Sequence, residues 1–182
     1  MRNTALKLVV CLGLWLTVQA TALAANEGWY GGFNMGSAEV EVIDESDLGY
    51  KFYGGYLSKF FGAELGFYGL GDGYTVDNVD VYGMSFEFVG RVPVSAKFSL
   101  LGRFGLFWWT VENCYDAYYY YYCEGGTYDD GDDLTYGVGV EFDVTDHVSI
   151  RGEWQEFTDV SGSDVSLLSA GIVYTFLSSG NW

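Results

Sequence analysis

Acidic and basic side chains recur at alternating positions within several apolar segments of the sequence, where they could form ion pairs with one another. Four are acids and four are bases: Lys51, Glu64, Glu87, Arg91, Arg103, Glu141, Arg151 and Glu153. Asn34, Ser149 and Gln155 accompany them and could add hydrogen bonds. Charges removed from water must be paired, because losing one partner costs roughly 3–5 kcal/mol. The balance predicts either a structural plug of ion pairs or, if the pairs exchange partners, a gated path for ions.

The segment 112–132 is a second candidate site. Cys114 and Cys123 are the only cysteines after Cys11, and in an exported protein we expect them to form a disulfide. The alternative is two free or metal-binding thiols, although two cysteines without a nearby histidine are a weak zinc signal. Between them lie consecutive tyrosines: Tyr118, Tyr119, Tyr120, Tyr121 and Tyr122. Tyrosine is common in binding surfaces. The run is therefore either a constrained loop that binds an external partner or a strand extension that faces lipid headgroups.

Catalysis is not indicated by the sequence. A Ser-His hydrolase needs its base within hydrogen-bond reach of the nucleophile, and the only histidine, His147, follows Thr145 and Asp146 in an expected short turn. The sequence contains no GxSxG motif and no cluster of metal ligands. The acidic run at 129–133 resembles a calcium loop only loosely, because spaced ligands and a closing Glu are missing. We expect no enzyme, no cofactor and no metal site.

Strict alternation between residues 81 and 109 shows which elements must position the charged side chains. Ser85, Glu87 and Arg91 alternate with large apolar residues, and after Pro93 the pattern resumes around Arg103. The apolar rows are Tyr82, Met84, Phe86 and Phe88 before the turn, and Leu100, Phe104, Leu106 and Trp108 after it. A period of two predicts β-strands with one apolar and one polar face.

The same signals predict eight strands along the chain. Their expected ranges are 28–36, 49–58, 60–70, 79–91, 98–111, 133–143, 147–157 and 165–176. Most have about the 9–11 residues that a tilted strand needs to cross a bilayer. Short turns are expected near 58–59, 92–97 and 143–146, and longer loops at 37–48, 71–78, 112–132 and 158–164. This alternation is typical of outer-membrane barrels, whose short turns are periplasmic and whose long loops lie outside.

The direction of the apolar rows distinguishes two kinds of barrel. In a membrane barrel the apolar rows face lipid and the charges face a polar lumen. In a soluble β-sandwich or a lipocalin-like barrel the apolar rows would face inward. The polar face here is rich in Gly, Glu and Arg while the other face is strongly aromatic, which favours the membrane barrel. An eight-stranded barrel leaves an interior just wide enough for side chains to fill.

The N-terminal segment, the composition and the net charge also limit the fold and function of the chain. A cleaved signal peptide over 1–24, followed by one domain over 25–182, is predicted by Arg2 and Lys7, the apolar stretch 8–18 and the small-x-small cleavage site at 22–24. The chain has 19% aromatic residues, 26 glycines and one proline, which favours an all-β protein. Its net charge of −17 argues against binding to nucleic acid. The acidic loops indicate a solvated surface, with divalent cations bridging it to lipopolysaccharide phosphates.

Several segments carry a resemblance to a known family. They are WYGGFNMG at 29–36, YGGYLSKFFGAELGFYGLG at 53–71, the hairpin 81–109, SIRGEWQEF at 149–157 and LLSAGIVYTF at 167–176. In order and spacing they resemble the small eight-stranded outer-membrane β-barrels of the OmpA-like transmembrane domain, OmpX and opacity-protein type. The resemblance implies an antiparallel up-and-down transmembrane β-barrel in the bacterial outer membrane. It also implies that the barrel assembly machinery reads a terminal aromatic residue, either Phe176 or Trp182.

The expected function follows from the resemblance together with the loops. We expect a monomeric outer-membrane barrel with a structural and surface-interaction role, adhesive or protective. Its expected partners are outer-membrane lipid, lipopolysaccharide and an extracellular ligand or host surface reached through the 112–132 loop. The alternative is a narrow, low-conductance, porin-like channel for ions or small solutes.

Overall fold

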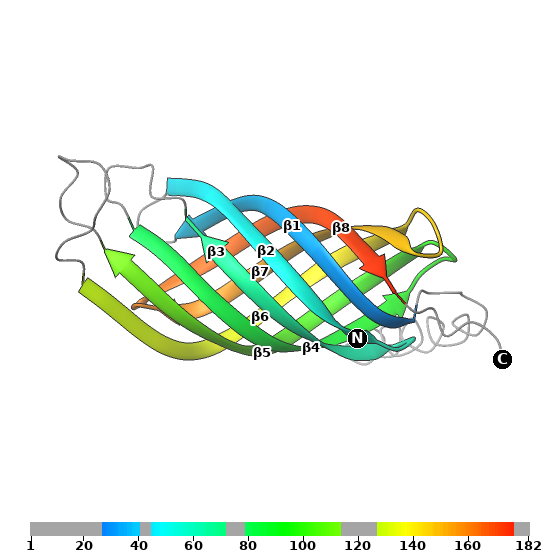
Figure 1. Ribbon diagram of the computed structural model, residues 1–182, viewed down its shortest axis with the longest axis horizontal. Helices are drawn as coiled ribbons and strands as arrows, with labels where there is room; N and C mark the ends of the chain where they lie inside the picture. Colours follow the sequence, from blue (N-terminus) through cyan, green and yellow to red (C-terminus); the bar gives the residue numbers. More distant parts are fainter. Residues whose placement is uncertain (1–26, 41–44, 72–78, 114–126, 177–182) are drawn as a thin grey trace, which may run out of the picture.

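The computed structural model describes residues 27–40, 45–71, 79–113 and 127–176, and these form one closed antiparallel β-barrel (Figure 1). Each strand pairs with its neighbours in the chain, and the first strand also pairs with the last. The strands are β1 (Gly28–Val40), β2 (Glu45–Leu57), β3 (Phe61–Leu70), β4 (Val79–Pro93), β5 (Phe98–Asn113), β6 (Thr127–Asp143), β7 (Val148–Val160) and β8 (Ser163–Thr175). The expected eight-stranded up-and-down barrel is confirmed. In the described ranges no helix is long and apolar enough to cross a membrane.

Several strands are longer than the sequence suggested. The prediction of a third loop over 112–132 was wrong at both ends, because β5 continues to Asn113 and β6 already begins at Thr127. The acidic run lies within β6, where Asp130 is paired with Thr110 and Asp132 with Trp108. Strand propensity depends strongly on context. Here, pairing with β5 outweighs the poor intrinsic preference of aspartate for strands.

Two further connections are also shorter than expected. The predicted loop 37–48 was too long, since β1 runs to Val40 and β2 starts at Glu45 opposite it. The predicted loop 158–164 is a tight hairpin, with only Ser161 and Gly162 between β7 and β8. Both have positive φ, at 50° and 85°, as in the type I′ turns that suit two-residue hairpins. The polar composition of this segment marked a turn, but it concealed how short the turn is.

The two ends of the barrel differ in their connections. The short turns 58–60, 94–97 and 144–147 lie at one end, together with the start of β1 and the end of β8 (Figure 1). We call this the short-turn end. At the opposite end, the loop end, β1 joins β2, β3 joins β4, β5 joins β6 and β7 joins β8.

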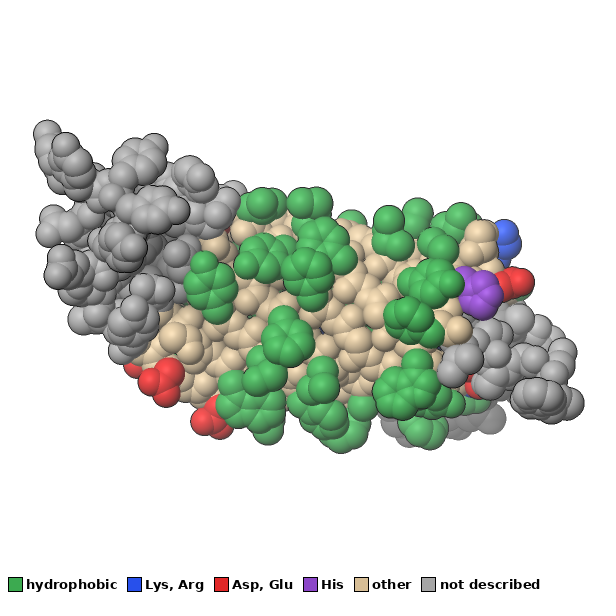
Figure 2. All heavy atoms as spheres, viewed as in Figure 1, with side chains coloured by type: hydrophobic (Ala, Val, Ile, Leu, Met, Phe, Trp, Pro, Cys, Tyr) green, Lys and Arg blue, Asp and Glu red, His purple; other side chains and the backbone are tan. Residues whose placement is uncertain are grey.

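The large apolar side chains cover the outside of the barrel. Leu106 is 43% exposed and Val138 is 60% exposed, whereas the residues that alternate with them point inward. Figure 2 shows hydrophobic side chains across the visible face, with charged side chains near its two ends. The soluble-barrel alternative, which required the apolar rows to face inward, is therefore wrong. An apolar outer band of this kind is the surface that a transmembrane barrel presents to lipid.

Substitution of Leu106 by arginine tests this orientation. Leu106 lies near the middle of β5, opposite Phe86 on one side and Leu134 on the other. We expect Leu106→Arg to lower the free energy of unfolding in lipid by about 2–4 kcal/mol, because arginine at the bilayer midplane costs about that much. The measurement is a urea titration of the barrel in bilayers. Val94→Arg, at an exposed site in the β4–β5 turn, is the control and should lose about 0–1 kcal/mol. Equal losses in both variants would contradict the assignment.

Candidate functional site

The eight charged residues singled out in the sequence all point into the lumen. None is more than 4% exposed. They come from β2 to β7, so the strands that carry them surround the interior on most sides. The inward residues of β1 and β8 in this region are uncharged, and Asn34 and Ser169 are examples. The charged side chains therefore form pairs across the barrel as well as between neighbouring strands.

Glu64 lies at the centre of the network. Its carboxylate is 2.7 Å from Lys51 Nζ, 2.8 Å from Arg103 Nη1 and 2.9 Å from Arg151 Nη1. The hydroxyl of Tyr30 donates a further hydrogen bond at 2.7 Å. One buried acid thus joins three cations that come from three different strands, which ties distant parts of the wall together.

Glu64 lies next to a second acid, Glu87, and Arg103 offsets the repulsion between them. The two acids are direct cross-strand partners on β3 and β4, an arrangement in which like charges repel. Arg103 Nη1 lies 2.8 Å from Glu64 and 3.2 Å from Glu87, so it bridges them. Removing Arg103 would therefore leave two buried acids side by side, and it would break three ion pairs, since Arg103 also contacts Glu153.

The remaining acids extend the network along the lumen. Glu141 pairs with Arg91 and with Arg151, whose Nη2 lies 2.7 Å away. Glu153 lies 2.9 Å from Arg103 Nη2 and 3.4 Å from Lys51. All four acids and all four bases are thus joined through ion pairs within hydrogen-bonding distance or slightly beyond it.

Tyrosines complete the polar interior, and the sequence reasoning missed them. Tyr68 donates a hydrogen bond of 2.6 Å to Glu87, and Tyr53 donates one of 3.0 Å to Asn34. Alternation within the strands did contain the signal, since Tyr53 shares its face with Lys51 and Tyr68 shares its face with Glu64. The sequence analysis placed Tyr82 in an outward row and considered the run Tyr118 to Tyr122, but it assigned no tyrosine to the lumen.

The uncharged polar residues proposed alongside the charges also point inward. Gln155 donates a hydrogen bond of 2.8 Å to Glu87 and another of 2.9 Å to the hydroxyl of Thr135. The side-chain amide of Asn34 donates a hydrogen bond of 3.3 Å to Glu153. Ser149 is buried nearer the short-turn end, and its hydroxyl donates a hydrogen bond of 2.6 Å to Asp143. These contacts satisfy acceptors that the cations leave open.

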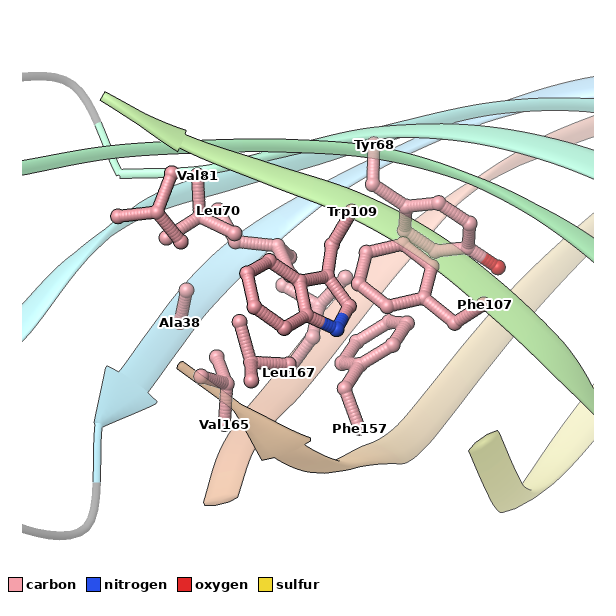
Figure 3. Packing of buried hydrophobic residues seen from close by; sticks show 11 residues of the cluster. Ala38, Tyr68, Leu70, Val81, Phe107, Trp109, Phe157, Val165 and Leu167 are labelled. Atoms are coloured by element: carbon pink, nitrogen blue, oxygen red, sulfur yellow. The ribbon is translucent and has the colours of Figure 1, made fainter. Parts of the chain in front are cut away.

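Aromatic and aliphatic side chains close the lumen on the loop side of the network. Phe107 and Phe157 have ring centroids 4.4 Å apart, and both rings also contact Tyr68. Figure 3 shows side chains from different strands pointing toward one another, with Trp109 among them. The indole nitrogen of Trp109 donates a 3.0 Å hydrogen bond to Asp133. The eleven-residue cluster is Ala38, Tyr68, Leu70, Val81, Phe107, Trp109, Val111, Phe157, Val160, Val165 and Leu167. We call it the aromatic layer.

His147 lies outside the lumen, and the remaining candidate site residues from the sequence lie outside the described part of the chain. His147 lies in the β6–β7 turn, where Nδ1 contacts the Thr175 carbonyl at 3.0 Å and the ring stacks on Tyr174. Cys114, Cys123 and the run Tyr118 to Tyr122 lie outside the described residues, as do the expected signal peptide and Trp182. Among the residues whose placement is given, no group of three or more His, Cys, Asp or Glu could hold a metal ion.

Lysine and arginine are distributed very unevenly over the barrel. After the first 26 residues they occur only at Lys51, Lys59, Arg91, Lys97, Arg103 and Arg151. Four of them belong to the buried network, and Lys59 and Lys97 lie in turns at the short-turn end. The loop end carries exposed acids, including Glu39, Asp130 and Asp132. Among the described residues, the loop end therefore presents acids without lysine or arginine, whereas the short-turn end presents both signs, since Glu27 and Asp146 also lie there.

Comparison with known proteins agrees with this architecture. Outer membrane protein A of Escherichia coli O157:H7 is 24% identical over 198 residues, which cover 97% of this chain and 55% of that protein, so the chain spans about half the length of this relative. Neisserial surface protein A has a TM-score of 0.62 at 13% identity, covering 84% of this chain and 100% of that one. Ail of Yersinia pestis has a TM-score of 0.58 at 15% identity, covering 83% and 99%. These two structures show the same fold.

The family assignment rests on a match that covers most of the sequence. The model of the outer membrane protein beta-barrel domain matches residues 8–176, which include every described strand. Together with the closed barrel and its apolar outer face, this match shows that the chain belongs to the outer membrane protein beta-barrel family.

Proposed function

We propose that this protein is a closed outer-membrane barrel with a structural role, and that its loop end acts as an interaction surface outside the cell. The observation that carries the proposal is the filled lumen. A buried network joins six strands, and the aromatic layer packs across the interior above it. In this proposal the barrel is a monomer that is exported through a cleaved signal peptide over 1–24, with its short-turn end in the periplasm.

The proposal assigns no catalytic role to the chain. His147 is the only histidine, and its ring is held in a turn by the Thr175 carbonyl and Tyr174. A base held in this way is accounted for by turn structure. The proposed activity is therefore non-covalent and resides in the barrel wall and the loop end, including the proposed disulfide between Cys114 and Cys123 and the tyrosine run that it encloses.

Replacing Glu64 by glutamine tests the structural role of the network. The substitution preserves size but removes the charge that Lys51, Arg103 and Arg151 share. We expect Glu64→Gln to lower the free energy of unfolding by about 3–5 kcal/mol, because it leaves four buried cations facing only three buried acids. Urea titration in bilayers measures the loss. Asp130→Asn, which removes an exposed acid from β6, should change stability by less than about 0.5 kcal/mol. A Glu64 variant as stable as this control would contradict the role.

The alternative function is a narrow channel, and the charged lumen is the feature that favours it. Ion pairs that exchange partners could open a water path, but the aromatic layer would still obstruct it. Phe107 and Phe157 are both 0% exposed and pack against each other. The alternative therefore requires the aromatic layer to move as well as the ion pairs.

Single-channel recording in planar bilayers separates the two functions. We expect the wild-type barrel to remain silent across voltage. Glu87→Ala and Arg103→Ala should also give no steady openings, because neither substitution removes the aromatic layer. A heat-dependent shift in gel mobility is the control that shows that the protein added to the bilayer is folded. Steady wild-type openings whose conductance changes in these variants would favour the channel and overturn the closed structural role.

The charge of the loop end limits the kind of surface that it can bind. A structure of Ail has been determined in complex with the heparin analogue sucrose octasulfate. Recognition of a sulfated polyanion normally relies on lysine and arginine, and this chain has neither at its loop end. We therefore propose that its external partner is cationic, or is an anionic surface bridged by divalent cations. This partner class refines the expected contact with lipopolysaccharide.

Binding of the barrel in nanodiscs to immobilised heparin and to immobilised polylysine tests this partner class. We expect no retention on heparin at physiological salt, and retention on polylysine that weakens as salt is raised. Because the whole chain is acidic, the matched comparison is between its two ends. Asp130→Asn with Asp132→Asn should weaken polylysine binding more than Glu27→Gln with Asp146→Asn, although both pairs remove two charges. Retention on heparin, or equal effects of the two pairs, would contradict the proposal.

A further inference from the structure

A groove on the outer wall of the barrel is not explained by the fold or by the closed lumen. It has a volume of about 850 Å³ and lies over β1, β2 and β3, with contributions from β4 and from Phe176. Its exposed lining is mostly apolar, and the outward side chains around it include Trp29, Phe52, Tyr56 and Leu65. Tyr30, Tyr53 and Glu64, whose polar groups belong to the lumen network, also border it. Sites for small ligands in proteins commonly have volumes of about 300–1,000 Å³. The groove is therefore large enough for a ligand and lies on the surface that faces lipid.

The groove exists because small residues occupy outward positions on adjacent strands. Gly31 on β1 is paired with Gly54 on β2, and Ala63 lies on β3. A Cβ atom at Gly54 would meet only the Tyr30 carbonyl oxygen, at 3.4 Å, and a Cβ at Gly31 would lie 3.5 Å from the Phe176 ring. The backbone thus has room for side chains at Gly54, and the sequence leaves that room empty.

The groove covers about one leaflet of the membrane. Trp29, Tyr56 and Phe176 lie at the short-turn end, next to the first residue of β1 and the last residues of β2 and β8. At its other limit the groove reaches Phe86, the cross-strand partner of Leu106 near the middle of β5, and Phe67, one outward position further toward the loop end. A ligand in the groove would therefore have its apolar part in the leaflet at the short-turn end and its headgroup at the adjacent surface.

Positive charge is available at that surface. Lys59 lies in the β2–β3 turn, three residues beyond Tyr56. It is one of two cationic side chains outside the lumen in the described part of the chain, and the other, Lys97, also lies at the short-turn end. Lysines at a membrane surface attract anionic lipid headgroups. The groove and the lysine together match the two parts of a phospholipid.

We propose that the groove holds one acyl chain of an anionic phospholipid in the leaflet at the short-turn end, and that Lys59 contacts its headgroup phosphate. A flexible acyl chain can follow a concave apolar surface, whereas the convex wall of a second barrel cannot fill it. The inference depends on the place of the barrel in the membrane and not on its closed lumen. A conducting barrel that still bound lipid would overturn the proposed function and leave this inference intact.

Native mass spectrometry of the detergent-solubilised barrel with added phosphatidylglycerol tests the proposal. We expect the wild type to retain one lipid per chain. Gly54→Leu should weaken retention at least tenfold, because its side chain enters the groove without displacing backbone. Gly152→Leu is the matched control, since a Cβ there meets nothing closer than Val140 at 3.7 Å and the residue lies outside the groove. This variant should retain lipid like the wild type.

A second substitution tests the headgroup contact. Lys59→Gln should weaken retention of phosphatidylglycerol by about fivefold and retention of zwitterionic phosphatidylcholine much less, because about one favourable lysine–headgroup interaction is lost. Circular dichroism establishes that all variants are folded. Equal retention by wild type and Gly54→Leu would overturn the acyl-chain site. Equal effects of Lys59→Gln on both lipids would overturn the headgroup contact. A two-chain mass that disappears in Gly54→Leu would show that a second copy occupies the groove.

Discussion

The ion pairs around Glu64 are the interaction on which the rest of the structure depends. A barrel in lipid satisfies its backbone only by pairing every strand with two neighbours, and closure brings the inward side chains of all strands into one narrow space. Here that space contains four acids and four bases with almost no exposure. Because unpaired buried charge is far more costly than a buried pair, the strands must adopt the register that brings Glu64 to Lys51, Arg103 and Arg151. The network therefore specifies how the barrel closes.

The layers on either side of the network determine what the interior can do. On the loop side, Phe107 and Phe157 separate the charges from water, and a smaller apolar cluster that includes Leu57 and Val173 lies nearer the short-turn end. Exclusion of water strengthens the attraction within the pairs and raises the cost of breaking them. Such a lumen suits stability better than conduction. Interaction with other molecules is thereby left to the loop end and to the outer wall.

Much of this arrangement could be predicted from the sequence, because a period of two fixes which face each residue occupies. Alternation alone placed Glu87 inside and Phe86 outside. It fails near the end of β7, where a register shift leaves both Phe157 and Val160 buried. It could not reveal which acid meets which base, since partner choice depends on register and on distances across the closed lumen. Strand ends also escaped prediction. Asp132 extends β6 only because Trp108 of β5 lies opposite it, and this long-range pairing leaves no local signal in the sequence.

The distribution of charge links the lumen to the two surfaces of the membrane. Since the network uses Lys51, Arg91, Arg103 and Arg151, only Lys59 and Lys97 remain for the exterior of the folded barrel, and both lie in turns at the short-turn end. The loop end is left with acids, so anions can approach it only with a bridging cation, while anionic headgroups can meet lysine at the opposite surface. A molecule with this asymmetry interacts differently with the two leaflets. Because the lumen uses most of the cations to balance its acids, the exterior is left with unevenly distributed charge. We therefore expect the specific contacts of the protein to form on its exterior.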